Sequence, residues 1–184
     1  MSTVDPLGAS SVPGDSAFPA DSFSDVMAAN SGYAAAFRGL GLGGRAAKGL
    51  AIITCMDSRI DPLSIVGMGP GDVKILRNAG ARVTEDVLRA LVLATYLLEV
   101  DRVLVLPHTR CKMVGTAEAD IHALIADEYG VDTRSMEFRT VRDERAALRR
   151  DLRRIRSFPL LPADLVVGGA VYDVDTGELH PIDG

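Results

Sequence analysis

The sequence contains no hydrophobic run long enough to cross a membrane and no excess of positive charge. A membrane-spanning helix needs about 20 mostly apolar residues in succession, and no such stretch occurs in the 184 residues. The 20 Lys and Arg residues are outnumbered by 25 Asp and Glu residues, which gives a net charge of −5. Proteins that bind nucleic acid usually carry a basic surface. We therefore expect neither a membrane nor a nucleic acid among the partners of this chain.

Cysteine is scarce, and the N-terminus shows no targeting signal. The first 20 residues contain an early aspartate, no Lys or Arg and no apolar core segment, so they do not resemble a secretory signal. A cytoplasmic location is the default expectation. The only two cysteines, Cys55 and Cys111, then favour metal ligands, catalytic groups or core residues over a disulfide, because the cytosol keeps thiols reduced.

Length and patterning indicate one folded domain after a flexible arm. A chain of 184 residues is the usual size of a single domain. Residues 1–20 are rich in Ser, Pro, Gly and Asp and are predicted to be a flexible arm, and residues 21–184 are predicted to form the domain. Short apolar runs alternate there with helical patterns, which is typical of a parallel α/β sheet with flanking helices. The predicted strands are 50–55, 73–77, 102–108 and 164–174, with a possible fifth edge strand at 177–182, and the predicted helices are 21–38, 85–99, 116–129 and 141–156.

Two predicted strands end in residues that bind transition metals. The first strand ends at Cys55, and the third ends at His108, with Cys111 shortly after it. Functional groups of an open α/β sheet gather at the carboxyl ends of its strands, and right-handed crossovers commonly place the first and third strands side by side. Two thiolates and one imidazole suit zinc, and three protein ligands with an open fourth position are typical of catalytic zinc. A buried cysteine at a strand end is also common as a small core residue, and the spacing alone leaves both interpretations open.

A carboxylate and a guanidinium follow the first of these cysteines. Asp57 and Arg59 lie close together on the loop that begins at Cys55. A guanidinium can hold a carboxylate with two hydrogen bonds. This would keep Asp57 off the metal and leave it to orient a metal-bound hydroxide. The alternative is an ordinary surface ion pair, which contributes under about 1 kcal/mol.

Three segments of the sequence resemble the β-class carbonic anhydrases. Residues 55–59 (Cys-Met-Asp-Ser-Arg) and 108–111 (His-Thr-Arg-Cys) look like the two zinc-binding motifs of that family, and residues 77–80 (Arg-Asn-Ala-Gly) resemble its loop after the second strand. The resemblance extends from about Leu50 to Val174. It implies a parallel sheet of order 2-1-3-4 and reversible hydration of CO₂ to bicarbonate by a zinc-bound hydroxide.

The resemblance also implies roles for individual residues. Cys55, His108 and Cys111 would bind one Zn²⁺ per chain. Asp57 and Arg59 would form the catalytic pair beside the open fourth position. The substrate would be CO₂ in one direction and bicarbonate in the other.

A subunit interface is a further implication of the resemblance. Members of the family form homodimers or higher oligomers, in which an N-terminal helix packs across the partner subunit and the substrate cleft lies at the dimer interface. The predicted helices 21–38 and 85–99 suit such an interface. The second of them is apolar on most of its faces, and a helix of that kind is buried in a core or between subunits.

The sequence departs from the common family pattern beside the second cysteine. Arg110 and Lys112 flank Cys111, where many members have a small or acidic residue and a glycine. Two cations there can hold bicarbonate, narrow the cleft or displace a tight turn, so efficiency and substrate stay open. The alternatives are a hydrolase of CS₂ or COS on the same site and a zinc-binding protein with impaired catalysis. The chain has no Trp, the residue used in the family's allosteric bicarbonate site, so that regulation is not expected.

Overall fold

The computed structural model describes residues 18–183 and divides the chain into two compact units. The first unit runs to Gly41 and contains the 3₁₀ helix η1 (Ala20–Phe23) and helix α1 (Ser24–Ala36). The helix predicted over 21–38 is therefore confirmed. The arm predicted over 1–20 lies outside the described residues except at its end, and both this arm and the domain boundary at residue 21 stay predictions.

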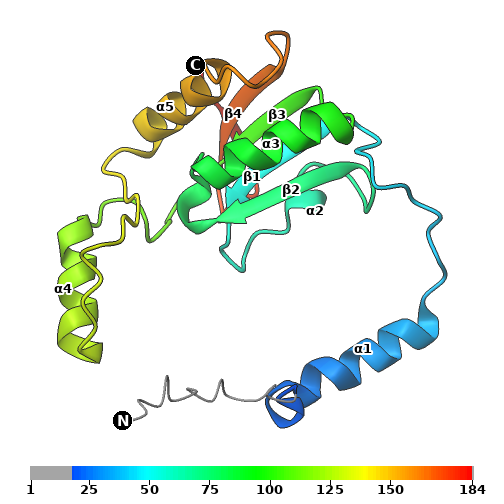
Figure 1. Ribbon diagram of the computed structural model, residues 1–184, viewed down its shortest axis with the longest axis horizontal. Helices are drawn as coiled ribbons and strands as arrows, with labels where there is room; N and C mark the ends of the chain where they lie inside the picture. The colour runs from blue at the N-terminus through cyan, green and yellow to red at the C-terminus, as the bar shows by residue number, and fades with distance from the viewer. Residues whose placement is uncertain (1–17, 184) are drawn as a thin grey trace, which may run out of the picture. The chain divides into compact units, whose positions relative to one another are not determined.

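The second unit, from Leu42 onward, is an α/β domain whose described residues form a five-stranded sheet (Figure 1). The strands lie in the order β2-β1-β3-β4-β5, with the first four parallel and β5 antiparallel to β4. They are β1 (Leu50–Cys55), β2 (Val73–Asn78), β3 (Arg102–Leu106), β4 (Val166–Tyr172) and β5 (Leu179–Pro181). The expected order 2-1-3-4 and the possible fifth edge strand are confirmed. β3 ends at Leu106 and not at His108, because Pro107 has no N–H to donate to a neighbouring strand.

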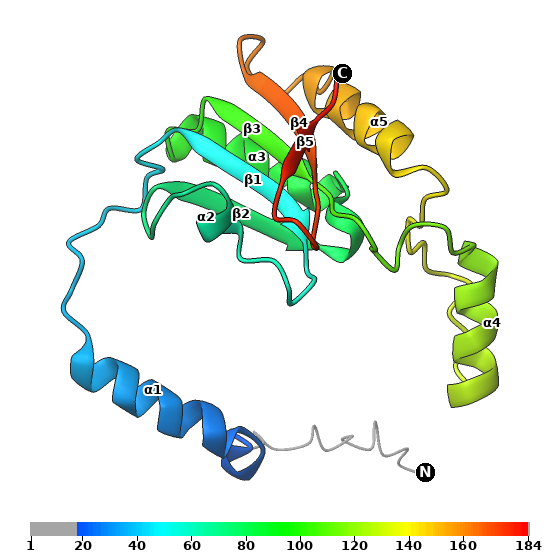
Figure 2. The ribbon, with the colours of Figure 1, turned by 180° about the vertical axis from the view of Figure 1, so that it is seen from behind.

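Helices cover both faces of the sheet. α3 (Glu85–Leu97) and α5 (Glu144–Arg156) pack on one face, where their buried side chains join Ile53 of β1 and Val105 of β3 (Figure 1). The short helix α2 (Pro62–Ile65) lies on the opposite face, where Ile65 packs against a cluster that contains Ile52 and Leu106 (Figure 2). β1 is buried along its whole length, as expected for a central strand covered on both sides.

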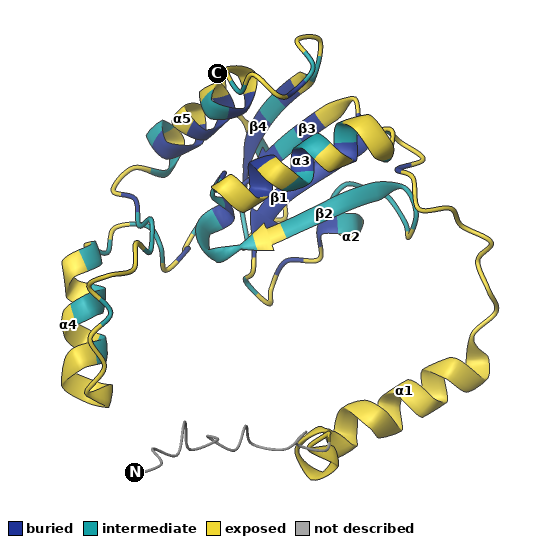
Figure 3. Ribbon diagram, viewed as in Figure 1, coloured by how far each residue is buried: buried dark blue, intermediate teal, exposed yellow. Residues whose placement is uncertain are grey.

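Two further helices, η2 (Ala79–Ala81) and α4 (Glu118–Tyr129), lie between β2 and α5 along the chain. η2 follows β2 directly, and α4 has no buried residue (Figure 3). The helices predicted at 85–99, 116–129 and 141–156 are confirmed as α3, α4 and α5. Within residues 18–183, no helix combines the length and hydropathy of a membrane span.

Helix α3 buries only one of its apolar faces. It begins where the hydroxyl of Thr84 accepts a hydrogen bond from the N–H of Val87 at 3.4 Å. Its inward residues are Val87, Leu88, Leu91 and Ala94. Three large apolar side chains on the same helix stay exposed, namely Leu93, Tyr96 and Leu97. The single chain therefore does not cover this helix completely.

A largely buried ion pair connects the loop after η2 to α5. Nε of Arg82 lies 2.7 Å from Oδ2 of Asp151, and the two side chains are 15% and 6% exposed. The same guanidinium donates to the carbonyl of Arg139 at 2.9 Å. The side-chain oxygen of Asn78 accepts from the N–H of Arg82, and its amide donates to the Arg82 carbonyl. These bonds hold the connection between β2 and α3 against α5.

We expect Asp151→Ala to destabilise the fold by about 3 kcal/mol, since it leaves the Arg82 guanidinium buried without its partner. Glu137→Ala is the matched control, because its ion pair with Arg139 at 3.3 Å is largely exposed, and we expect a loss of under about 1 kcal/mol. Urea unfolding of both variants measures the difference. Equal losses would contradict a structural role for the buried pair.

Candidate metal centre

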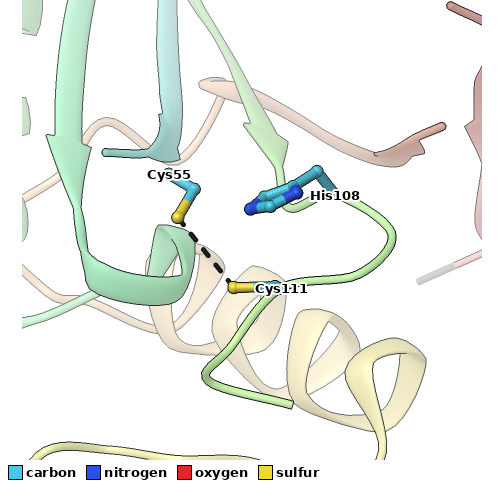
Figure 4. Close-up of side chains that lie close together, drawn as sticks. All are labelled: Cys55, His108 and Cys111. Atoms are coloured by element: carbon cyan, nitrogen blue, oxygen red, sulfur yellow. Dashed lines mark hydrogen bonds between the residues drawn. The ribbon is translucent and has the colours of Figure 1, made fainter. Parts of the chain in front are cut away.

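The parallel pairing of β1 with β3 brings the predicted ligands together. Thr54 is in register with Leu106, so the residues that follow both strands emerge at the same edge of the sheet. Sγ of Cys55 lies 4.0 Å from Sγ of Cys111. One ligand atom from each of Cys55, His108 and Cys111 lies within 4.8 Å of the other two, and all three residues are buried (Figure 4).

The spacing and the free imidazole nitrogen fit a tetrahedral metal site. Zn–S bonds of about 2.3 Å at tetrahedral angles place two sulfurs about 3.8 Å apart, close to the 4.0 Å observed. Nδ1 of His108 donates to the carbonyl of Thr109 at 2.9 Å, an arrangement that orients a metal-binding imidazole. Nε2 is buried and has no hydrogen-bond partner among the described residues. Burial lowers the pKa of His108, so the ring is neutral and Nε2 offers a lone pair.

The Cys111 thiol needs a nearby cation if it is to ionise. Burial raises the pKa of the Cys111 thiol, so an empty site keeps it protonated. A bound divalent metal would reverse this balance and stabilise the thiolate. The N–H of Gly80 points at Sγ of Cys55 from 3.4 Å. Two sulfurs and one imidazole therefore fit zinc, and their assignment as ligands stays a prediction.

The Asp57 carboxylate is held by hydrogen bonds from Arg59 beside the three candidate ligands. Nε of Arg59 donates to Oδ1 at 2.9 Å, and Nη2 donates to Oδ2 at 2.7 Å. The backbone N–H of Arg59 also donates to Oδ1. These hydrogen bonds hold the pKa of Asp57 well below its usual range. Oδ2 lies 3.8 Å from Nε2 of His108, so an ionised carboxylate stands next to the metal position and is turned toward Arg59.

Arg77 has a supporting role that the sequence analysis did not identify. Its Nε donates to the carbonyl of Cys55 at 2.9 Å, and its Nη2 donates to the carbonyl of Asp57 at 2.7 Å. Arg77 stands opposite Thr54 in the β1–β2 register. Its position near the end of the predicted neighbouring strand was the one feature of the sequence that could have indicated this role. One side chain thus fixes the backbone on both sides of Met56.

A side chain at Gly80 would be strained by the backbone conformation and crowded by its neighbour. Its φ of +78° lies in the left-handed region that favours glycine. A Cβ there would come within 3.1 Å of Cβ of Met113, which follows the second cysteine closely. The close approach keeps the Gly80 N–H directed at Cys55.

The loop that carries His108 and Cys111 is held by the end of β4 and by the turn that follows it. Thr109 donates from its N–H to the carbonyl of Tyr172 at 2.9 Å. Arg110 adopts a left-handed backbone with φ of +57°, and its Nη2 lies 2.7 Å from Oδ2 of Asp175. The sequence analysis singled out Arg110 but not Asp175, because nothing local links positions so far apart.

A cleft with a volume of about 630 Å³ opens onto this centre. Both cysteines line it, and its charged lining residues are Asp57, Arg59, Arg110 and Lys112. The structure therefore gathers the two cysteines, the Asp57–Arg59 pair and the two unusual cations around one space. His108 is not among the lining residues and has 1% of its surface exposed.

The chain is similar to carbonic anhydrases over most of its length. A family model described as carbonic anhydrase matches residues 50–179. β-Carbonic anhydrase 1 of Mycobacterium tuberculosis is 36% identical over 159 residues, which span 86% of this chain and 96% of that protein. A crystal structure of a carbonic anhydrase from Streptococcus mutans superposes with a TM-score of 0.82 at 34% identity and covers 88% of this chain and 97% of the other.

A more distant relative carries a different name. The carbon disulfide hydrolase of Acidithiobacillus thiooxidans is 26% identical over 153 residues, which span 72% of this chain and 76% of that protein.

We expect about one zinc per chain in the purified protein, and a loss of zinc affinity of more than about 100-fold in Cys111→Ser and in His108→Ala. The reason is that each variant removes a proposed ligand, whereas removal of a residue that merely orients a ligand costs about 10- to 100-fold. Elemental analysis and competition with a chelator measure both quantities. His180→Ala is the control, because this partly exposed histidine is not in the cluster. Full zinc retention in Cys111→Ser would exclude the assignment.

Proposed function

The chain belongs to the β-carbonic anhydrase family, and from this membership we infer that it catalyses the reversible hydration of carbon dioxide to bicarbonate with zinc as its cofactor. The observation that carries this function is the buried cluster of Cys55, His108 and Cys111 at the carboxyl ends of adjacent strands. We propose that these three residues hold one zinc ion per chain. Their donor atoms leave a fourth position, which is the pattern of catalytic zinc.

When bound, zinc supplies Lewis acidity, which lowers the pKa of a coordinated water toward neutrality. The residues of the protein then orient the nucleophile toward CO₂. Asp57 has no spare proton, because the hydrogen bonds from Arg59 keep its pKa low. It can therefore accept a hydrogen bond from the attacking water and aim the oxygen lone pair at CO₂.

Arg59 acts on the reaction by restraining Asp57. A free carboxylate 3.8 Å from Nε2 of His108 is close enough to become a fourth metal ligand after a small rotation. The two hydrogen bonds from Arg59 occupy both carboxylate oxygens and oppose that rotation. Arg77 fixes the backbone at both ends of the same segment. The pair therefore keeps the fourth position open while the hydrogen-bond acceptor Asp57 stays beside it.

Hydrolysis of CS₂ or COS is the second candidate, because named carbon disulfide hydrolases are 26% to 28% identical to this chain. These matches support the alternative only as another activity within the same family. Stopped-flow assays of CO₂ hydration and of CS₂ consumption on zinc-loaded protein distinguish the two. We expect CO₂ hydration, and its absence from pH 7 to 9 at full zinc content would overturn the proposed function.

A reducing, cytoplasmic location also stays a proposal. Its support is chemical, since the two thiols lie only 4.0 Å apart and are free. Thiols so placed remain available as zinc ligands where the surroundings keep cysteines reduced.

We expect Asp57→Asn to retain zinc and to lose about 100-fold in kcat, the scale of one well-placed catalytic hydrogen bond. Arg59→Ala should also retain zinc and lose activity to a similar or greater extent, because it frees Asp57 to occupy the fourth position. Metal analysis beside stopped-flow kinetics checks both variants.

The chain offers a matched control for this pair. Asp132 and Arg134 have the same spacing and the same hydrogen-bond pattern, with distances of 2.9 Å and 2.7 Å, but lie outside the cluster. Arg134→Ala should leave kcat unchanged. Wild-type kcat in Arg59→Ala, or an equal loss in Arg134→Ala, would contradict the assigned role.

We also propose that the chain forms a homodimer or a multiple of it. The support is apolar surface that a single chain leaves exposed. On α1 this surface includes Val26, Met27 and Tyr33, and on α3 it includes Tyr96 and Leu97. Exposed apolar patches of this kind mark sites of protein association.

Sedimentation velocity at micromolar concentration should show a dimer or a larger even oligomer. Leu97→Lys should shift the distribution toward monomer, because it places a charge on a surface that association would bury. Leu160→Lys is the control, since this residue is about equally exposed but lies on neither α1 nor α3. A monodisperse wild-type monomer would exclude the proposal.

A further inference from the structure

The cleft above the metal centre has the opposite charge balance to the chain as a whole. The chain carries a net charge of −5. Among the residues that line the cleft, however, Arg59, Arg110 and Lys112 are cationic, and Asp57 is the single carboxylate. A zinc ion held by two thiolates adds no net charge. An anion entering this cleft therefore meets a positive local field.

Two of the three cations already have partners. Arg59 is paired with Asp57 at 2.7 Å, and Arg110 is paired with Asp175 at 2.7 Å. Lys112 is exposed and lines the cleft, and its ammonium group makes no ion pair within residues 18–183. Its backbone is held, since the hydroxyl of Thr116 donates to the Lys112 carbonyl at 3.2 Å. Lys112 thus offers an uncompensated charge from an anchored position.

We propose that Lys112 captures bicarbonate at the mouth of the cleft. This inference rests on the proposed function, in which the two carbon species differ in charge. CO₂ is neutral and gains little from a nearby cation, whereas bicarbonate is a monoanion and is attracted by it. Lys112 therefore affects the binding of bicarbonate and not that of CO₂. The guanidinium groups of Arg59 and Arg110 attract bicarbonate less strongly, because their charges are already compensated by Asp57 and Asp175.

With Lys112 present, the site should be saturated at a lower bicarbonate concentration than without it. An interaction that holds one ligand without helping the transition state changes the concentration needed for saturation and not the chemical step. Lys112 should accordingly strengthen both bicarbonate binding and product inhibition of CO₂ hydration. One unlike charge pair near a protein surface in water corresponds to about a three- to tenfold change in affinity.

Formate tests this proposal directly, because it is a small carboxylate monoanion that the enzyme does not turn over. Isothermal titration of zinc-loaded protein at fixed ionic strength measures its affinity without any assay of activity. We expect Lys112→Gln to weaken formate binding about three- to tenfold and to weaken product inhibition by bicarbonate to the same extent. Lys112→Arg keeps the charge and should stay within about twofold of wild type.

Lys48→Gln is the matched control for net charge. Lys48 is exposed and precedes β1, so it lies at the edge of the sheet opposite to the cleft. It should leave formate affinity unchanged. Unaltered formate affinity in zinc-replete Lys112→Gln, or an equal loss in Lys48→Gln, would overturn the proposal. A wild-type protein that binds formate through Lys112 but hydrates no CO₂ would support the anion site and contradict the proposed function instead.

Discussion

The whole site depends on the parallel pairing of β1 with β3. Residues Leu50 to Thr54 lie in register with Arg102 to Leu106, so both strands reach the same edge of the sheet at the same height. Cys55 continues the first strand, and His108 and Cys111 follow the second. A slip of one residue would turn every side chain of a strand to the other face. Because β1 is buried on both faces, such a slip would disturb the core as well as the metal centre.

The neighbouring strands stabilise this edge from both sides. On one side, Arg77 at the end of β2 binds the carbonyls of Cys55 and Asp57. On the other side, the end of β4 holds the second motif through Thr109, and the turn after β4 holds it through the Arg110–Asp175 ion pair. The three candidate ligands therefore need little rearrangement to bind a metal, which is the condition for a site with an open position to keep its geometry.

The Asp57–Arg59 pair has a local structure that occurs twice in this chain, and its surroundings in the fold distinguish it. Asp132 and Arg134 form the same local arrangement, in which an Asp accepts from the backbone N–H and the guanidinium of the residue two positions later. Local geometry therefore does not distinguish the two pairs. They differ in their surroundings, because Oδ2 of Asp57 lies 3.8 Å from the free nitrogen of His108. Of these two pairs, the first lies beside the proposed metal site.

The α/β class, the strand and helix order, and the three candidate ligands with the Asp57–Arg59 pair were all predicted from the sequence. The class and the order of elements follow from hydrophobic periodicity, which can be recognised locally. The roles of the ligands and of the pair are what the resemblance of two short motifs to the β-carbonic anhydrases implies, and they stay predictions. The supporting contacts were decided by the tertiary structure alone. Arg77 reaches the backbone of Cys55, Arg82 pairs with Asp151, and Arg110 pairs with Asp175. Each contact joins positions that only strand register and helix packing bring together, and several charged residues in the sequence could have served as the partner. Chain folding, and not any local pattern, selected among them. Among residues 18–183 it left Lys112 as the cation at the cleft without an ion-pair partner.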